Sequence, residues 1–142
     1  MSRKLFTAAA TLLILGGLAT AQQNFTFTKG ATANIPFAFN VGNQAFPAGV
    51  YTVQIDREKQ MVVIRNNDRK SRIFLANNDE IRVAPHKSEL VFRHLGDHFF
   101  LTAVWTEGSF EGERLIPGSL ETEMARRQTG SPQTIAVQAQ AR

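Results

Sequence analysis

The chain has 142 residues, no cysteine, 43% apolar residues and a formal net charge of +4. This length is typical of one domain, and the lack of cysteine excludes disulfide bonds and thiol chemistry. The apolar fraction is sufficient for a core that needs no covalent cross-links.

The first 21 residues have the pattern of an export signal. Arg3 and Lys4 precede an apolar run, 5–18, and the small-residue motif Ala19-Thr20-Ala21 follows it. The run is shorter than the roughly 20 residues that a membrane-spanning helix needs, so we expect cleavage after Ala21. An uncleaved anchor is the alternative. The mature chain, 22–142, is then a single all-β domain of net charge +2, because the signal holds two of the cations. We expect it to be periplasmic or secreted, and not an integral membrane protein.

Alternation with a period of two dominates the mature chain, which is typical of strands with one buried face. A short alternating run covers 24–28, and a longer one covers 31–41. Pro36 lies inside the longer run and predicts an edge position or a bulge, because proline cannot donate to a strand ladder.

A hairpin follows the turn residues Pro47-Ala48-Gly49. The polar segment 57–60 joins its two strands, so that Ile55 faces Val62 and Val53 faces Ile64. A polar turn at 66–71 and a short strand at 73–76 come next.

A second hairpin runs from Ser88 to Trp105 around the turn Gly96-Asp97. A two-residue turn places Phe92 opposite Leu101. The face that we assign to the core consists of Leu90, Phe92, His94, Phe99, Leu101, Ala103 and Trp105. The other face has four apolar members, which form a possible interaction surface unless the chain's own C-terminal segment covers them, as we expect: Val91, Leu95, Phe100 and Val104.

The C-terminal segment contains a predicted helix at about 119–128, with Ser119 as its cap and Gly130 just past its end. An alternating run at about 134–141 is either a closing strand or a frayed tail. Together the elements predict an all-β fold, namely a single antiparallel sandwich or small barrel of seven to eight strands with one short C-terminal helix.

Metal, cofactor and nucleophile chemistry find little support. His94 and His98 have the i, i+4 spacing of a helical metal site, but the intervening hairpin turn sends them to opposite faces. Neither asparagine-rich turn, 66–68 or 77–80, matches a calcium loop. We therefore predict no metal site, no cofactor and no enzyme.

Three acids after the second hairpin are the strongest catalytic candidates. Glu107, Glu111 and Glu113 are conceivable as a carboxylate pair for sugar hydrolysis. A domain of this size leaves little material for a deep cleft, so solvated acidic loops are the preferred interpretation.

A possible anion patch lies between the two hairpins. It consists of Arg65, Arg69, Lys70 and Arg72, which surround the single acid Asp68. An exposed patch of this kind suits an anionic surface polymer such as a glycan or a lipid head group. Nucleic acid is not expected for an exported protein.

Three segments carry a resemblance. The stretches 35–42, 46–53 and 96–101, with Val104-Trp105, resemble a group of small uncharacterised exported proteins of soil bacteria. That group has no assigned activity, so the resemblance implies export and no catalytic residue. Separately, 47–53 resembles the strand-entry turn of prealbumin-like β-sandwich domains, which implies a sandwich.

These observations favour an exported, non-catalytic β-module, binding or structural, with a protein or a cell-surface glycan as its partner. The alternatives are a small-ligand-binding barrel, an outer-membrane β-barrel and, less favoured, a small glycan-active enzyme. A lined cavity in the fold would favour a small ligand, whereas a filled core would favour an interaction module.

Overall fold

The computed structural model describes residues 29–141, apart from the side chains of residues 29, 78 and 79. The predicted export signal and the alternating run 24–28 lie outside the described residues.

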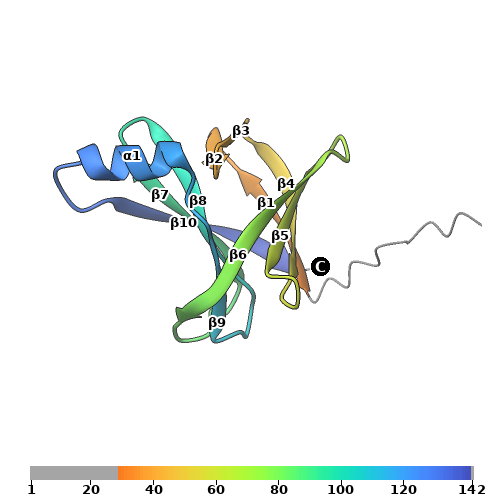
Figure 1. Cartoon of the computed structure of the whole chain (residues 1–142). Helices are drawn as coiled ribbons and strands as arrows, with labels where there is room; N and C mark the ends of the chain where they lie inside the picture. The colour runs from red at the N-terminus through yellow and green to blue at the C-terminus, as the bar shows by residue number, and fades with distance from the viewer. Residues whose placement is uncertain (1–28, 142) are drawn as a thin grey trace, which may run out of the picture.

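Eight antiparallel strands close into a barrel (Figure 1). In order around the barrel they are β1 (Lys29–Ile35), β4 (Gly49–Asp56), β5 (Met61–Asn66), β6 (Ser71–Ile81), β9 (Glu111–Leu115), β8 (His98–Trp105), β7 (Ser88–Leu95) and β10 (Gln133–Ala141). Pairing of β10 with β1 completes the circle. The all-β prediction is therefore confirmed, and the choice between sandwich and barrel is decided in favour of the barrel.

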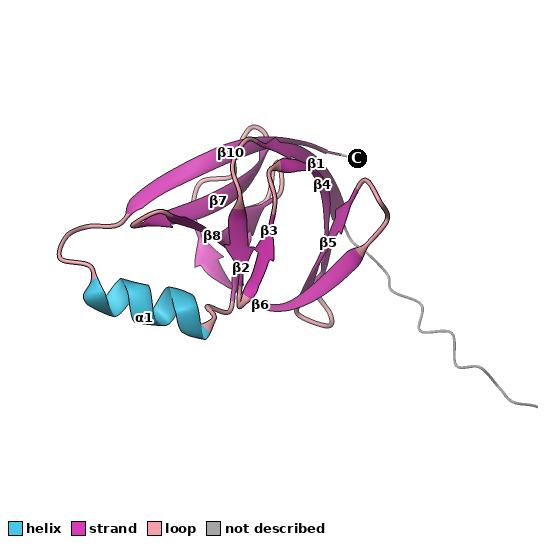
Figure 2. Ribbon diagram, turned by 90° about the horizontal axis from the view of Figure 1, so that it is seen from above, coloured by secondary structure: helices cyan, strands magenta, loops and turns pink. Residues whose placement is uncertain are grey.

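A short hairpin lies across the upper opening of the barrel, as the view from above shows (Figure 2). Its strands are β2 (Phe39–Val41) and β3 (Gln44–Phe46), and Asn40 pairs with Phe100 of β8. The predicted single strand over 31–41 is wrong, because the chain leaves the barrel wall at Pro36, which lacks the N–H that a continuing ladder needs.

The barrel interior is filled by aliphatic side chains and a cluster of aromatic rings. The ring of Phe37 stacks on Phe99 with centroids 4.1 Å apart, and Phe39 meets Phe92 edge to face at 5.5 Å. Phe39 also stacks on Phe46, at 5.2 Å. The hairpin β2–β3 therefore acts as a plug whose rings continue the core.

The register of β4 and β5 agrees with the sequence prediction. Ile55 pairs with Val62 and Val53 with Ile64, and all four side chains belong to the core. Strand β6 is longer than the predicted 73–76, and β9 was not predicted at all.

A β-bulge in the second hairpin corrects the predicted faces. Phe92 pairs with Leu101 as expected, but Val91 pairs with Ala103, so Thr102 is the extra residue. Its hydroxyl donates to the carbonyl of Val91 at 3.1 Å, which satisfies a group that the bulge removes from the ladder.

Beyond the bulge the alternation is inverted. Val104 joins the interior core, whereas Trp105 packs outside the barrel against Gly112 of β9. The guanidinium of Arg82 covers the other side of the indole, 4.1 Å from the ring centroid. The predicted inner side for Trp105 and outer side for Val104 are therefore exchanged, although Trp105 is buried, as expected of a core residue.

The helix α1 (Ser119–Arg127) begins at a cap that comes from another part of the chain. The Oδ1 of Asn43, in the β2–β3 turn, accepts from the N–H of Ser119 at 2.8 Å and from its hydroxyl at 3.0 Å. Gly118 permits this approach, since a Cβ there would collide with Asn43. Ser119 is thus the first helical residue and not the cap.

Helix α1 packs against β7 on the outside of the barrel. Glu121 is buried there, with its carboxylate 3.5 Å from the guanidinium of Arg93. Burial raises the pKa of Glu121, and the charge of Arg93 partly opposes that rise. Leu95 and Phe100, at the same end of the hairpin, are fully buried.

Two core residues test the hairpin register. Phe92→Ala should cost about 3–5 kcal/mol and Leu101→Ala about 2–5 kcal/mol of unfolding free energy, since both are buried. As direct neighbours they should be non-additive in a double-mutant cycle measured by urea unfolding. His98→Ala, at an exposed position, is the control and should change little. Equal losses at all three positions would contradict the register.

Gly112→Ala tests the outer position of Trp105. The added Cβ would lie 2.5 Å from Cε2 of the indole, so we expect destabilisation of about 1–3 kcal/mol from overpacking. Fluorescence of the single tryptophan should shift to longer wavelength as the ring is displaced. Gly30→Ala is the matched control, because its added Cβ meets neighbours at 3.6 Å, an ordinary contact. An unchanged spectrum and stability in Gly112→Ala would rule out this packing.

Candidate anion-binding site

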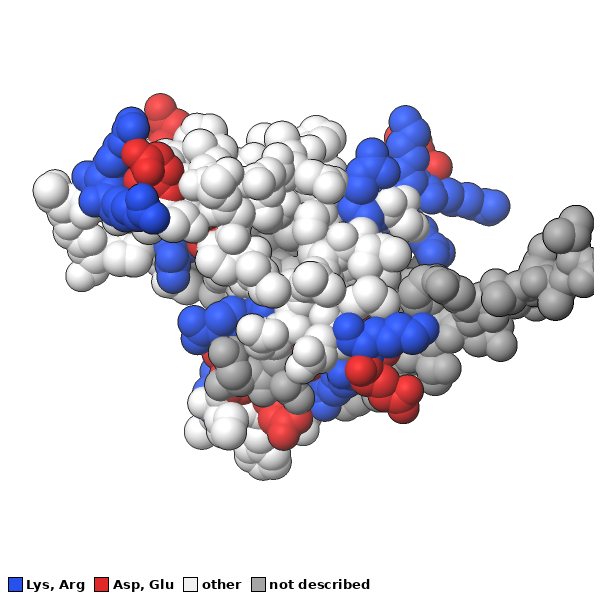
Figure 3. All heavy atoms as spheres, viewed as in Figure 1, with Lys and Arg blue, Asp and Glu red and all other residues white. Residues whose placement is uncertain are grey.

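The four residues of the predicted anion patch lie on and beside the turn between β5 and β6. All four are exposed, and this turn forms the blue cluster at the upper right of Figure 3. Hydrogen bonds fix the turn, because the N–H of Lys70 donates to Oδ1 of Asn66 at 3.0 Å and the N–H of Asn66 donates to the carbonyl of Lys70 at 3.2 Å.

The strand register divides the patch into two faces. Arg72 pairs with Ile64, a core residue, so it projects from the inward face at the rim of the barrel. Arg65 pairs with Thr52 on the outward face, and its Nε donates to the hydroxyl of Ser71 at 3.1 Å. The sequence prediction treated these residues as one patch, but only Lys70 and Arg72 face the barrel opening.

Lys70 and Arg72 form one wall of a hollow of about 210 Å³ at the upper end of the barrel. We call it the basic hollow. Its lining residues are Gln44, Ala45, Phe46, Pro47, Tyr51, Asn66, Lys70 and Arg72. They come from β3, from β4 and the turn before it, and from the adjoining ends of β5 and β6 with the turn between them, so barrel closure and the plug together create the site.

The aromatic side of the basic hollow is held in place by its own contacts. The hydroxyl of Tyr51 donates to the carbonyl of Pro47 at 2.7 Å, which fixes the turn before β4. The Tyr51 ring meets Phe46 edge to face at 5.9 Å. Burial raises the pKa of Tyr51 above its ordinary value. The phenol is therefore neutral at physiological pH and adds no negative charge beside the two cations.

The cations of the basic hollow differ from most other described arginines in having no carboxylate partner. Arg57, Arg82, Arg93 and Arg114 each lie within ion-pair distance of a glutamate. Among the side chains that the structure describes, no ion pair involves Lys70 or Arg72. Asp68, the acid of the same segment, does not line the hollow. An anion entering the hollow would thus meet uncompensated positive charge.

The other predicted interaction surface is not an exposed patch. Leu95, Phe100 and Val104 are at most 1% exposed, and Val91 is half-buried. The bulge accounts for Val104 by turning it into the core. Helix α1 packs against β7, the strand that carries Val91 and Leu95, and cover of this face by the C-terminal segment stays a prediction.

The three glutamates considered as catalytic candidates do not form a free carboxylate pair. The Nε of Arg57 donates to buried Glu113 at 2.8 Å, and the same guanidinium lies 3.8 Å from Glu111. Glu107 is exposed. Arg57 therefore neutralises two of the three carboxylates, at the barrel end opposite the basic hollow.

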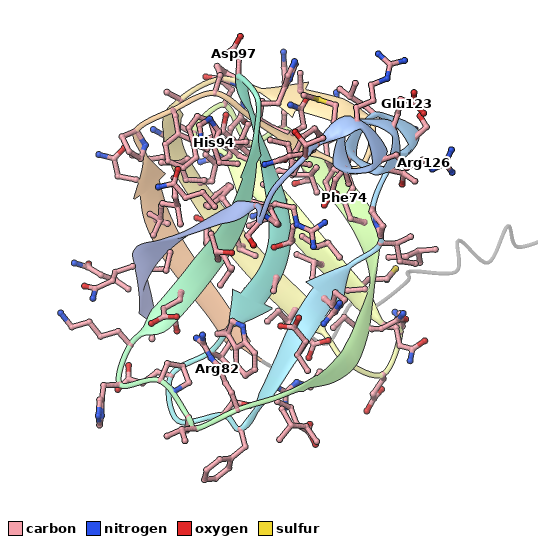
Figure 4. The ribbon with its side chains drawn as sticks, turned by 90° about the vertical axis from the view of Figure 1, so that its left-hand side faces the viewer. Phe74, Arg82, His94, Asp97, Glu123 and Arg126 are labelled. Carbon is pink, nitrogen blue, oxygen red and sulfur yellow. The ribbon has the colours of Figure 1, made fainter. Side chains whose placement is uncertain are left out.

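The two histidines have separate surroundings. His94 stacks on Phe99 with centroids 4.3 Å apart, and His98 lies 6.0 Å from the ring of Phe100. Figure 4 shows His94 near Asp97, which marks the β7–β8 turn, while Arg82 lies towards the other end of the barrel. The described residues contain no group of three or more metal-ligating side chains in a suitable arrangement. No helix in the described part of the chain is long and apolar enough to cross a membrane.

Sequence reasoning missed the uncharged half of the basic hollow. The predicted β4–β5 register, extended by one step, places Tyr51 opposite Asn66, so the aromatic side was within reach of the pattern. The contribution of Gln44 and Phe46 could not be predicted from the pattern, because it depends on how the plug folds over the barrel opening.

Comparisons with protein-family models, with curated proteins and with solved structures find no match for this chain. Function must therefore be argued from the geometry of the site.

Titration of Tyr51 tests its burial in the hollow. It is the only tyrosine of the chain, so phenolate absorbance reports on it alone. We expect a midpoint above the ordinary value of about 10 in the folded protein, and one near 10 in urea. Because the folded pKa is the higher one, stability that is present below pH 10 should be lost as the pH rises through the folded pKa. Identical midpoints in the two states would show that the ring is not desolvated.

Proposed function

We propose that this chain is an exported, non-catalytic β-barrel module that binds an anionic group of a cell-surface glycan in the basic hollow. The observation that carries this proposal is the pair of cations Lys70 and Arg72, which have no carboxylate partner among the described side chains and lie beside the aromatic side of one hollow. Export rests on the sequence pattern of residues 1–21.

The filled interior supports a binding module that acts at its surface. Ile35, Phe92 and Leu90 are 0% exposed and lie in one continuous core cluster. An interior packed in this way leaves no room for a ligand among these side chains, so the barrel serves as a rigid support for its rim.

A non-catalytic role is supported by the disposition of the acids. Glycoside hydrolysis needs one carboxyl group kept as an acid and a second one free to act as base or nucleophile. Here Arg57 binds Glu113 and approaches Glu111, and the basic hollow is lined by no carboxylate. The hollow has groups that can hold an anion and none that can perform the reaction.

The chemistry of the lining suits an acidic sugar. A guanidinium such as that of Arg72 can donate two parallel hydrogen bonds to a carboxylate or a sulfate, and Lys70 adds a point charge. The amides of Gln44 and Asn66 can exchange hydrogen bonds with hydroxyl groups. Tyr51 and Phe46 supply an apolar surface, and the volume of about 210 Å³ suits a single sugar unit.

Binding at such a site should be weak and sensitive to salt. Both cations are exposed, and exposed charge pairs contribute about 0.2–1 kcal/mol each. We therefore expect a dissociation constant in the high micromolar to millimolar range. Repeated acidic units on a polymer would increase the apparent affinity through rebinding and multiple attachment.

The experiment is an NMR titration of the mature chain with an oligosaccharide of uronic acid. The comparison ligand is the same oligosaccharide with its carboxylates reduced to alcohols. We expect shifts at residues of the basic hollow only with the acidic ligand, and weaker binding at high salt. Arg72→Ala should weaken binding several-fold, because it removes the bidentate donor.

Arg65→Ala is the matched control. It removes the same charge from the same turn, but Arg65 lies on the outward face and does not line the hollow. Its affinity should stay near that of the parent. Equal losses in Arg65→Ala and Arg72→Ala would reduce the effect to general electrostatic attraction, and equal binding of the neutral ligand would overturn the proposal.

A further inference from the structure

The plug has little backbone connection to the barrel wall. Its strands, β2 and β3, have three residues each and pair with one another. Among the described residues, one strand pairing joins the plug to the wall, namely that of Asn40 with Phe100 in β8. Strand β3 lies at the end of the strand order and lines the basic hollow with Gln44, Ala45 and Phe46. The position of these three residues therefore depends on side-chain contacts.

Aromatic packing fixes one end of β3. The ring of Phe46 stacks on Phe39 with centroids 5.2 Å apart and meets Phe74 at 6.0 Å. Phe39 is buried in the core, so Phe46 is held from below. Gln44, at the other end of β3, is exposed, and core packing does not hold it.

Contact with the start of α1 fixes this other end. Asn43 directly precedes Gln44, and its Oδ1 accepts the two hydrogen bonds from Ser119, at 2.8 Å and 3.0 Å. The backbones also touch, since a Cβ on Gly118 would collide with the carbonyl group of Gly42. The turn of the plug and the start of α1 thus lie side by side, as Figure 2 shows.

Helix α1 is itself attached to the barrel wall. Glu121 is buried with its carboxylate 3.5 Å from Arg93 of β7. Met124 packs on the β7–β8 turn, where a Cβ on Gly96 would lie 3.3 Å from the methyl carbon of Met124. A continuous series of contacts therefore runs from β7 through α1 and Asn43 to β3.

We propose that α1 holds the plug in the position that the basic hollow requires, so that Asn43 and Ser119 are positioning residues for anion binding. This inference rests on the proposed function, since it concerns the same site. Both residues are uncharged and neither lines the hollow, so an effect on binding must act through β3. Without the link, only a fraction of the molecules has a complete hollow, and the apparent affinity falls by that fraction.

The substitution Ser119→Pro breaks the link and leaves α1 intact. Proline has neither an N–H nor a hydroxyl group, so both donors to Asn43 are lost. Ser119 is the first helical residue, where proline is favoured because that N–H has no partner within the helix. Gly118 has a ψ of 174°, the extended conformation that a following proline requires. The first helical hydrogen bond, from the N–H of Thr122 to the carbonyl of Gly118, stays in place.

Amide hydrogen exchange of the mature chain measures the hold on the plug without any ligand. We expect faster exchange at residues 41–46 in Ser119→Pro and in Asn43→Ala, with β4 and β5 unchanged. Asn43→Asp should exchange as the parent does, because its carboxylate keeps an acceptor oxygen beside the start of the helix, where negative charge is favoured. Leu120→Ala, at the next and exposed position of α1, is the matched control and should have no effect.

The NMR titration with the uronic acid oligosaccharide tests the link to binding. Ser119→Pro and Asn43→Ala should each bind about two- to five-fold more weakly, the loss that follows from removing exposed hydrogen bonds. The double variant should bind no more weakly than either single variant, because both changes remove the same contact. Leu120→Ala should bind as the parent does.

The outcomes separate this inference from the proposed function. A parent chain that does not bind refutes the proposed function and with it the role of the two residues in binding, whereas hydrogen exchange still shows whether α1 holds the plug. Unchanged exchange in both link variants, a parent that binds no better than they do, or losses that add in the double variant would each overturn the inference. If Ser119→Pro fails to fold, Asn43→Ala with Asn43→Asp as its rescue decides the question.

Discussion

Filling the interior of a closed barrel is the constraint on which the rest of this structure depends. Eight strands enclose a space just wide enough to be packed by side chains, and any part left empty loses dispersion contacts on every side. Here phenylalanine rings from the wall and from the plug occupy that space, with Phe39 in contact with both Phe92 and Phe46. Because the wall strands alone leave the upper end open, the chain needs β2 and β3 to complete its core.

Completion of the core determines where chemistry can occur. A packed interior leaves only the rims and the outer surface for polar groups. The charged side chains differ between these two places. On the outer surface arginines are paired with glutamates, as with Arg93 and Glu121 under α1. At the upper rim the plug brings Phe46 beside the β5–β6 turn, where Lys70 and Arg72 have no acid partner among the described residues. The candidate site is thus a consequence of how the barrel end is closed.

The parts of the fold that the sequence predicts are those governed by local pattern. The β4–β5 register follows from alternation and a short connection, and it agrees with the structure from Val53 to Ile64. The bulge at Thr102 breaks alternation in mid-strand and is stabilised by a hydrogen bond to Val91, which no periodicity reveals. Strand β9 escapes prediction because its sequence, with glycine and three charged residues, has low strand propensity and is held by partners on both sides.

Only the cations of the candidate site could be predicted from the sequence, because the rest of the site also depends on tertiary structure. A run of cations in one turn is visible in the sequence, but the face from which each one projects depends on the strand register. Arg65 pairs with Ser71, so Arg72, one residue further along β6, projects from the opposite side of the barrel wall. The helix cap shows the same dependence on tertiary structure, since Asn43 reaches Ser119 across 76 positions of sequence.

The plug and the first part of β10, which has no partner in β1, are both related to the course of the first strand. If the pairing of Ala31 with Ala141 continued in register, Pro36 would face Ala136, because 31 and 141 have the same sum as 36 and 136. Proline has no N–H to offer there, and the chain instead turns inward and forms β2. The turn supplies the barrel with Phe37 and Phe39, which complete the core. It also removes the strand that would have covered the first half of β10. The change of direction thus accounts for the packing of the plug and for the lack of a β1 partner along residues 133–136, whereas the pairing of β1 with β10 already ends at Thr32, before Pro36 is reached.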